Sequence, residues 1–241
     1  MKKLIYSLFV GASAVFMTSC MGIDNFDEPG AHFTGRIIDA TTGENLLADQ
    51  GECRVRIWEK SFSLNPEHQD IPVKQDGTFN NTKLFNGTYD IVPQGAWWPA
   101  DTIRLGIGKK TVTQNFEVTP YLKLFDFQTE LVGDSLFMHC RIDAPKKEGL
   151  PQIMEIRPYL SLNQFCGAAN CISHYNNTTH RVNIMQSWDK IEKLEDGKSK
   201  VFTVKAQVKP GYIYFVRMGA KVRDDFEKFN YTEIKEIEVP K

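Results

Sequence analysis

Short runs in which apolar and polar residues alternate fill most of this 241-residue chain. Such alternation is typical of β-strands that turn one face to a core and the other to solvent. Glycines separate some of the runs, at Thr42-Gly43, Asp76-Gly77 and Asn86-Gly87, where tight turns need a positive φ. The pattern predicts strands over residues 32–39, 53–60, 77–80, 87–92, 102–105 and 111–118, then over 122–130, 135–142, 153–161, 181–185, 201–208, 212–222 and 232–239. We therefore expect an all-β protein.

Chain length and one proline divide these strands into two β-sandwich domains. Domains commonly span about 100 to 150 residues, so this chain is long enough for two. Proline ends a strand at Val118-Thr119-Pro120 and the alternation restarts directly after it, which predicts domains over residues 31–118 and 119–241. In the second domain Trp188, Ile191 and Leu194 recur at helical spacing, which predicts a short helix over residues 187–194.

The N-terminus has the order of an export signal. Lys2 and Lys3 precede an apolar run over residues 4–17, and Thr18-Ser19-Cys20 closes it in a pattern that resembles a bacterial lipobox. The run is shorter than the roughly 20 residues of a membrane-spanning helix. The sequence predicts a signal peptide over residues 1–19, a lipidated Cys20 at the mature N-terminus and a polar tether over residues 20–30. The alternative is an ordinary secretory signal followed by an incidental cysteine.

Several segments of the first half resemble a transthyretin-like domain of the carboxypeptidase-regulatory type. They are Ala31-His32-Phe33-Thr34-Gly35-Arg36-Ile37-Ile38-Asp39, Thr42-Gly43-Glu44, Asp76-Gly77-Thr78-Phe79 and Leu84-Phe85-Asn86-Gly87-Thr88-Tyr89. The second half, with Tyr212-Ile213-Tyr214-Phe215-Val216-Arg217-Met218 before a closing strand, is similar to an immunoglobulin or fibronectin type III sandwich. Together they resemble the two-domain lipoproteins of unknown function from Bacteroidetes polysaccharide-utilisation loci.

That resemblance implies a location and a role. It implies a lipid anchor in the outer membrane, with glycan capture beside an outer-membrane transporter, but it identifies no ligand residue. An acidic stretch close behind the lipidated cysteine resembles the Bacteroidetes signal for display on the cell surface, and Asp24, Asp27 and Glu28 provide such a stretch here. We therefore expect an outer-membrane lipoprotein that faces the outside of the cell.

Trp97 and Trp98 form the strongest candidate binding feature of the sequence. They follow Pro93-Gln94-Gly95-Ala96 in a segment that breaks the strand alternation. Sugar rings stack on such aromatic faces, and Gln94 and Asp101 are placed to bond sugar hydroxyls. The alternative is that one or both tryptophans pack between the domains or cap a sheet. Trp58 is interpreted as a core residue.

Cys166 and Cys171 lie in a polar, asparagine-rich loop over residues 163–179. In an exported protein their spacing favours a loop-closing disulfide. With His174 and His180 nearby, the same residues can also be read as a metal site, or the thiols can be free. Because the spacing matches no structural zinc motif, we predict the disulfide and no metal. The cysteines in strand patterns are interpreted as buried small hydrophobic residues: Cys53 and Cys140.

Two further patterns concern modification and catalysis. The segments Asp101-Thr102-Ile103 and Asp134-Ser135-Leu136 resemble the acceptor motif for Bacteroidetes protein O-glycosylation, which marks Thr102 and Ser135 as candidate sites. An acidic cluster over residues 224–227 suggests paired glycosidase carboxylates, but neighbouring strand positions point to opposite faces, so a solvated hairpin is the better interpretation.

Composition narrows the function further. With 29 basic and 30 acidic residues the chain has no basic excess for phosphates, so no nucleic-acid partner is expected. The sequence holds no nucleophile elbow, phosphate loop, metalloprotease histidine pair or dinucleotide fingerprint, and we expect neither a cofactor nor enzymatic activity. The patterns favour a glycan-binding accessory protein. The alternative is a structural or protein-interaction module, such as a spacer or a transporter partner, since fold alone does not separate the two.

Overall fold

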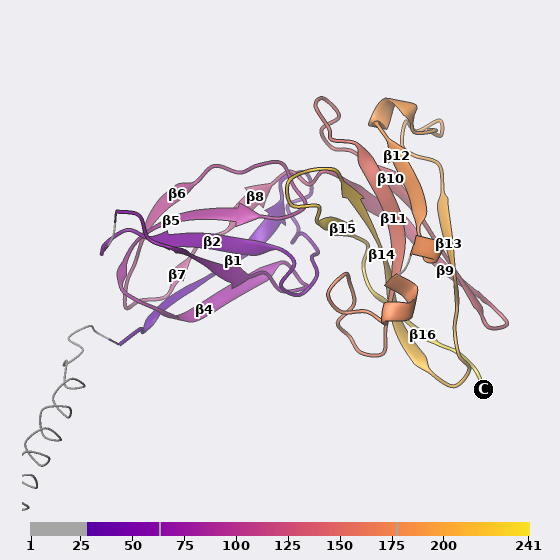
Figure 1. Ribbon diagram of the computed structural model, residues 1–241, viewed down its shortest axis with the longest axis horizontal. Helices are drawn as coiled ribbons and strands as arrows, with labels where there is room; N and C mark the ends of the chain where they lie inside the picture. Colours follow the sequence, from indigo (N-terminus) through magenta and orange to yellow (C-terminus); the bar gives the residue numbers. More distant parts are fainter. Residues whose placement is uncertain (1–27, 63, 177) are drawn as a thin grey trace, which may run out of the picture.

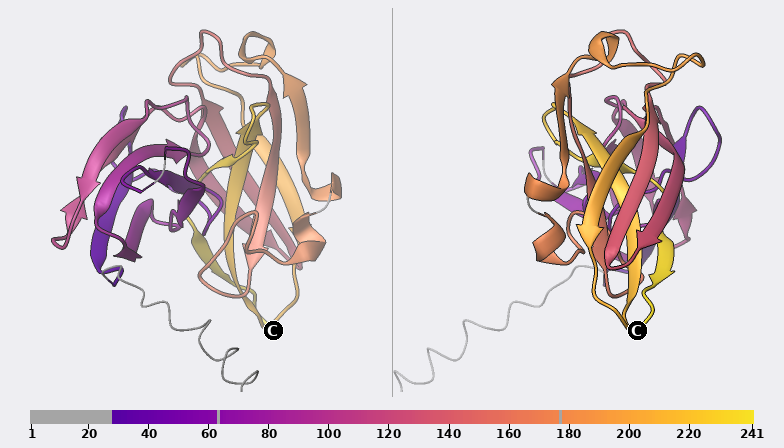
Figure 2. Two further views of the ribbon diagram at one scale, coloured as in Figure 1. Left: turned by 60° about the vertical axis from the view of Figure 1, so that its left-hand side comes forward. Right: turned by 90° about the vertical axis from the view of Figure 1, so that its right-hand side faces the viewer.

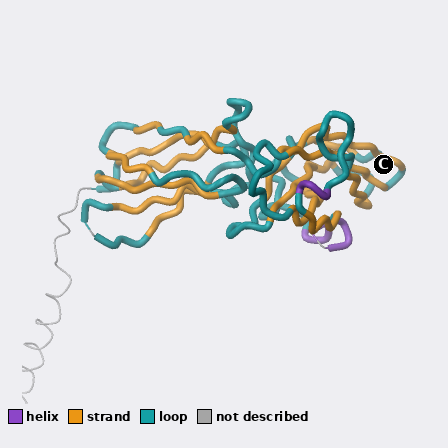
Figure 3. Tube along the Cα trace, turned by 90° about the horizontal axis from the view of Figure 1, so that it is seen from above, coloured by secondary structure: helices purple, strands orange, loops and turns teal. Residues whose placement is uncertain are grey.

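The computed structural model describes residues 28–241 except 63 and 177. The predicted signal peptide, Cys20 and most of the tether lie outside the described residues. The described chain forms two β-sandwiches arranged end to end (Figure 1), with loops gathered where they meet (Figure 3). The predicted all-β, two-domain fold is therefore confirmed. Among the described residues, no helix has the length and apolar character that crossing a membrane requires.

The first domain packs two four-stranded sheets face to face. One sheet has the order β4-β1-β7, with β8 also on β1, and the other has the order β3-β2-β5-β6. Its strands are β1 (Ala31–Asp39), β2 (Arg54–Glu59), β3 (His68–Pro72), β4 (Thr78–Leu84), β5 (Gly87–Gln94), β6 (Ile103–Ile107), β7 (Val112–Thr113) and β8 (Phe116–Val118).

The second domain packs a three-stranded sheet, β13-β10-β9, on a five-stranded sheet, β12-β11-β14-β15 with β16 also on β14. The three-stranded sheet faces the viewer in the right panel of Figure 2. The strands of the second domain are β9 (Lys123–Val132), β10 (Ser135–Asp143), β11 (Ile153–Ser161), β12 (Val182–Gln186), β13 (Phe202–Gln207), β14 (Ile213–Val222), β15 (Phe229–Tyr231) and β16 (Lys235–Glu238). Short 3-10 turns accompany them: η1 (Ser173–Asn176), η2 (Thr178–His180) and η3 (Trp188–Lys190).

Sequence alternation decides which side chains fill the second core. On β10 every second residue is fully buried, at Leu136, Met138, Cys140 and Ile142. Burying each such apolar side chain contributes about 1.5–3 kcal/mol relative to leaving it in water. The buried partners across this sheet come from alternate positions of β13, which pairs antiparallel with β10. The predicted burial of Cys53 and Cys140 is confirmed.

Three differences between prediction and structure concern strands, and a fourth concerns the predicted helix. β3 was missed because His68-Gln69-Asp70-Ile71-Pro72 is mostly polar and lies at a sheet edge. β15 was missed because its three residues are all buried and do not alternate. The predicted strand over 111–118 divides into β7 and β8. The predicted helix over 187–194 is only the 3-10 turn η3, whose N-cap Ser187 makes no capping side-chain bond.

A buried polar network joins the two domains. The Asp49 carboxylate is fully buried and accepts hydrogen bonds from Ala169 N (2.5 Å) and Asn170 Nδ2 (3.2 Å) of the second domain. Arg217 of β14 donates from Nη1 to the Ala48 carbonyl (2.9 Å), and its Nη2 lies 3.8 Å from Asp49 Oδ1. Because burying unpaired charge is costly, this network holds the domains in one arrangement.

A second group of contacts reinforces the junction. Glu52 accepts hydrogen bonds from Tyr231 Oη (2.5 Å) and from the Phe229 N–H (3.3 Å). Burial raises the pKa of the Glu52 carboxyl above its ordinary value. The Asn230 amide accepts a bond from Leu122 N (3.0 Å) and donates one to the Ala96 carbonyl (2.9 Å), so it connects both domains to the segment between them.

Candidate functional site

The structure places the predicted tryptophan pair at the domain junction. Trp97 is 2% exposed and belongs to the first core. Its ring lies against Gly95, where an added Cβ comes within 2.2 Å of a ring carbon. Pairing between Trp97 and Pro120 fixes the segment to the interdomain connection. The predicted stacking of a sugar on Trp97 is therefore wrong, because the ring is covered by protein.

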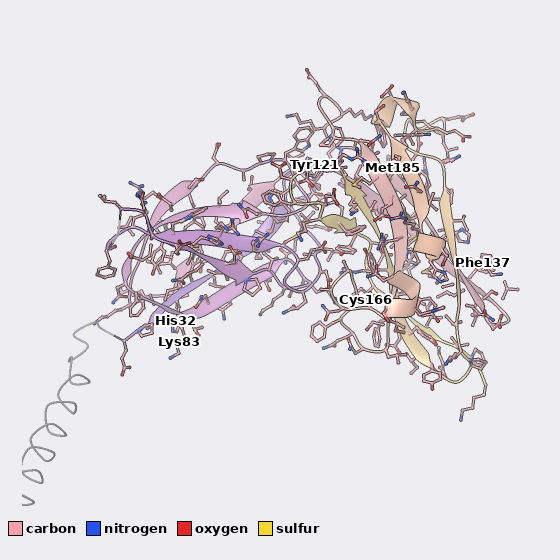
Figure 4. The ribbon with its side chains drawn as sticks, in the orientation of Figure 1. His32, Lys83, Tyr121, Phe137, Cys166 and Met185 are labelled. Carbon is pink, nitrogen blue, oxygen red and sulfur yellow. The ribbon has the colours of Figure 1, made fainter. Side chains whose placement is uncertain are left out.

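Trp98 packs toward the second domain. Its ring centroid lies 5.3 Å from that of Tyr121 and 4.3 Å from Lys146 Nζ, and the ring also contacts the second core. Its backbone N–H donates to the Thr119 carbonyl (2.9 Å). Figure 4 labels Tyr121, which marks this junction. Both tryptophans therefore serve the contact between domains, which is the alternative that the sequence left open.

Gln94 and Asp101, predicted to bond a sugar stacked on the tryptophan pair, have no open tryptophan face beside them for that sugar. Gln94 ends β5 half-buried, and Asp101 is exposed. Trp58, predicted in the core, is only half-buried, and its ring centroid lies 6.3 Å from that of His68. The reason is the register of β2: Val55 and Ile57 occupy the core positions, so Trp58 faces outward.

Cys166 and Cys171 are free thiols in this structure, so the predicted disulfide is not formed. The buried Cys166 Sγ lies 3.3 Å from each of two backbone carbonyl oxygens, one of β11 and one of β14, which share its single S–H donor. Burial raises the pKa of the Cys166 thiol to about 12. Across residues 28–62, 64–176 and 178–241, no three His, Cys, Asp or Glu side chains are grouped to hold a metal ion. His174 and His180 instead pack ring to ring, with centroids 5.5 Å apart.

The remaining predicted positions lie on the surface. Thr102 is exposed, and Ser135 is half-buried at the turn between β9 and β10, so their O-glycosylation stays a prediction. The acidic cluster forms a turn between β14 and β15, where the Glu227 N–H donates to Asp224 Oδ1 (2.7 Å) and Glu227 pairs with Lys221 (3.0 Å). This geometry agrees with a solvated hairpin.

A cleft at the end of the second domain brings together side chains that the sequence did not single out for binding. We call it the distal cleft. It has a volume of about 660 Å³ and lies between the β9–β10 turn, the segment after β11, η1 and the β13–β14 turn. Its lining includes Asp134, Leu162, His174, Gln207, Lys209 and Tyr212.

The β13–β14 turn positions the aromatic side chain of this cleft. Lys209-Pro210-Gly211-Tyr212 has proline in the second position and glycine in the third, and Gly211 has φ +79°. This is the sequence and conformation of a type II turn. Tyr212, directly after it, is 49% exposed, whereas Tyr214 on the same face of β14 is buried and its Oη accepts a bond from Lys209 N (3.1 Å). The buried Tyr214 thus holds the turn that carries the exposed Tyr212.

Polar groups line the same cleft as Tyr212. The two-residue turn Gly133-Asp134 between β9 and β10 places the Asp134 carboxylate, which accepts a bond from Gln207 Nε2 (2.8 Å). That bond holds the pKa of Asp134 below its usual range, so the group is an anionic acceptor at neutral pH. Exposed amide and ammonium donors, Gln207 and Lys209, lie beside it.

The chemical capacity of the distal cleft is recognition by stacking and hydrogen bonding. An exposed aromatic ring, a fixed carboxylate, an amide and an ammonium match a ligand that has both C–H faces and hydroxyl groups. One signal for it was present in the sequence, a tyrosine directly after Pro-Gly at the start of a strand. Lys209 belongs to the same turn and Gln207 ends β13 just before it, whereas Asp134 comes from the β9–β10 turn, so its proximity depends on tertiary structure.

Comparisons with known proteins agree with this architecture. No curated protein matches the sequence. A DUF3823 family protein from Bacteroides uniformis is 23% identical and covers 88% of this chain and 100% of its own, with a TM-score of 0.73. Another Bacteroides uniformis protein, described as a candidate carbohydrate-binding protein, is 18% identical with the same coverage and a TM-score of 0.70. A DUF3823 family protein from Parabacteroides merdae is 19% identical, also with the same coverage, at a TM-score of 0.63.

Two family profiles cover nearly all of the described chain. Residues 31–119 match the N-terminal domain of a protein of unknown function (DUF3823), and residues 122–236 match its companion domain of unknown function (DUF3823_C). The two matches occur in the order of the two sandwiches and meet at the connection between them. The chain therefore belongs to the two-domain DUF3823 family.

Proposed function

We propose that this protein is a glycan-binding accessory lipoprotein that is anchored in the outer membrane through Cys20, faces the cell surface and acts without catalysis. The observation that carries the proposal is the distal cleft, where Tyr212 is 49% exposed beside a carboxylate, an amide and an ammonium. A structurally similar Bacteroides uniformis protein is described as a candidate carbohydrate-binding protein, which adds support for the same ligand class.

The position of the cleft suits a tethered binding protein. β1 begins at the end of the first domain that lies away from the second, near His32 and Lys83 (Figure 4). The elements that line the distal cleft, among them the β9–β10 turn, η1 and the β13–β14 turn, belong to the other domain (Figure 1). A protein anchored through the segment before β1 therefore has room to present the cleft away from the membrane, to glycans or to an outer-membrane transporter.

The cleft lining supports binding over turnover. Glycoside hydrolysis ordinarily uses two carboxyl groups, about 5 to 10 Å apart, on either side of the scissile bond. Among the described residues that line the distal cleft, Asp134 is the only carboxylate. Its pKa is lowered, whereas a general acid needs a raised one.

A glycan array followed by affinity electrophoresis tests the binding role. We expect the protein to be retarded by at least one plant or host polysaccharide, and Tyr212→Ala to reduce the retardation roughly tenfold through the loss of stacking. The matched control is Ile213→Ala, because Ile213 is 45% exposed on the opposite face of the same strand. If no glycan binds on the array or retards the protein in the gel, the proposal is contradicted and the structural or protein-interaction alternative is favoured.

The anchor needs its own test. Mass spectrometry of the mature protein is expected to show a diacylated Cys20 as the first residue, and Cys20→Ser is expected to release the protein from the membrane fraction. A mature protein that starts beyond Cys20 without lipid contradicts the anchor and leaves the glycan test unaffected.

A further inference from the structure

A second cleft lies between the two domains and is separate from the distal cleft. This interdomain cleft has a volume of about 390 Å³. The first domain contributes Gln50, Gln75 and Asp76 to its lining, and the second contributes Phe165, Arg217 and Glu233. Clefts between domains are preferred places for small ligands, because each domain supplies part of the wall.

Arg217 lines this cleft and has two buried hydrogen-bond donors without a partner among the described residues. The side chain is 1% exposed, and its guanidinium stacks 3.7 Å from the centroid of the Tyr231 ring. Nη1 donates to the Ala48 carbonyl, but Nε and Nη2 have no hydrogen-bond partner among the described residues. Buried polar groups are nearly always bonded, so an unpaired pair of donors on one edge of an arginine requires an explanation. That edge is the one that bonds two adjacent oxygen atoms at once.

The surrounding charges argue against an anionic ligand. Asp49 is fully buried beside Arg217, with 3.8 Å between Oδ1 and Nη2, and already balances its charge. Asp76, Glu233 and one further cation, Lys74, also line the cleft, so Lys74 balances only one of these two carboxylates. A ligand carboxylate would add a further negative charge here, whereas a neutral ligand with paired hydroxyl groups would not.

We propose that the interdomain cleft is a second sugar site, which takes a neutral sugar unit through two adjacent hydroxyl oxygens that accept bonds from Nε and Nη2 of Arg217. The Phe165 ring, 42% exposed, packs on the C–H face of the sugar. Asp76 and Glu233 accept bonds from its other hydroxyl groups. The choice of a sugar as the ligand class rests on the proposed function, while the position of the site rests on the unpaired arginine edge.

Entry to the site requires the loop over residues 164–170 to move. Nε and Nη2 are closed to solvent, and a Cβ added to Gly167 would lie 2.4 Å from Nη2, so this loop covers the arginine. Gln75 holds the loop through a bond from Nε2 to the Gln164 carbonyl (2.9 Å) and one from Cys166 N to Oε1 (3.0 Å). Sugar binding therefore replaces or rearranges these two bonds.

Hydrogen exchange and titration test the second site in a Tyr212→Ala background, which removes the distal site. The probes are glucose, galactose and mannose, with glucuronate as the acidic counterpart. We expect one neutral sugar to alter amide exchange over residues 164–170, with glucuronate binding more weakly.

Arg217→Lys keeps the positive charge but loses the two-donor edge, and Phe165→Ala removes the packing ring. Each is expected to weaken binding about tenfold. The control is Phe85→Ala, since Phe85 is 40% exposed and does not line the cleft.

The outcomes separate the two proposals. Unchanged exchange over residues 164–170 with all three neutral sugars overturns the second site, even if the protein with Tyr212 intact still binds polysaccharide. Tighter binding of glucuronate, or equal binding by Phe165→Ala and Phe85→Ala, also overturns it. Amide exchange over residues 164–170 that changes with sugar supports the second site. If polysaccharide binding is also unaffected by Tyr212→Ala, the distal site is contradicted.

Discussion

At the junction, the aromatic and charged side chains of the second domain are buried and bonded to the first domain, whereas at the distal cleft similar side chains are exposed. Tyr231 is 6% exposed and donates to Glu52, while Tyr212 is 49% exposed above its buried neighbour Tyr214. Arg217 is 1% exposed at the junction, and Lys209 is exposed at the cleft. The same residue types thus support assembly in one region and leave a surface available for ligand in the other.

This difference means that residue type alone does not identify which aromatic side chain is available to bind a ligand. Trp97 and Trp98 are the more prominent residues in the sequence, but an antiparallel contact with the interdomain connection buries Trp97 and holds the half-buried Trp98 against the second core. Tyr212 stays exposed because it follows a turn at the free end of a strand. Substitutions in the two regions are therefore expected to affect different measurements.

The largest expected effect on stability is at Trp97. Trp97→Ala removes a large side chain from the first core, and such truncations typically cost about 3–5 kcal/mol of unfolding free energy. We expect urea denaturation to show a loss of this size. Tyr212→Ala, which uncovers no core, is expected to change the unfolding free energy by less than about 0.5 kcal/mol. Similar losses for both variants would remove the distinction between the two regions.

Arg217 is expected to show the next largest effect. Arg217→Ala leaves the buried Asp49 carboxylate without its cationic neighbour, and breaking such a buried pair costs about 3 kcal/mol. Equilibrium unfolding measures this loss. Arg104→Ala is the control, because Arg104 forms an exposed pair with Asp90 at 2.7 Å and is expected to give no resolvable change. An Arg217→Ala protein as stable as the control would show that the junction does not depend on this network.

Glu52 is expected to make the junction sensitive to pH. Burial raises its pKa above 4.5, so the folded state holds the proton more tightly than the unfolded chain does. Stability from this group is full below the unfolded pKa and is lost as pH rises through the folded pKa. Relative to Glu52→Gln, the wild-type unfolding free energy should therefore fall as the pH rises from 4.5 toward neutral. A difference that stays constant over that range would contradict the assignment.

The smallest expected effect is that of reductant. Both thiols of the Cys166 loop are free, and burial raises the pKa of Cys166 to about 12. We expect dithiothreitol to leave the melting temperature unchanged. A thiol-reactive dye should label Cys166 only after unfolding, because the thiolate is the reactive form. A drop in melting temperature with reductant would instead indicate the disulfide that the sequence predicted.

The sequence was sufficient for the architecture because strand alternation is a local signal. Alternation predicted a strand over residues 135–142, and its alternate residues Leu136, Met138, Cys140 and Ile142 are all fully buried. Local patterns failed where tertiary contacts decide the outcome. β3 is held as an edge strand by pairing with β2, although its residues are mostly polar, and the helical spacing at Trp188 produced only a 3-10 turn.

The candidate sites were harder to predict for the same reason. The distal cleft needs Asp134 from one turn, His174 from η1 and Tyr212 from another turn, and no sequence spacing connects them. The interdomain cleft needs Gln75 and Arg217 from different domains. Whether an aromatic is open to ligand depends on what covers it, as the contrast between Trp97 and Tyr212 shows.

The most direct test of this account is a calorimetric titration of the best-retained glycan against Tyr212→Ala and Trp98→Phe. Trp98→Phe keeps an aromatic ring at the junction, so it is expected to bind like the wild type. Tyr212→Ala is expected to raise the dissociation constant about tenfold. If Trp98→Phe weakens binding and Tyr212→Ala does not, the ligand lies at the junction tryptophans and the distal cleft is not the binding site.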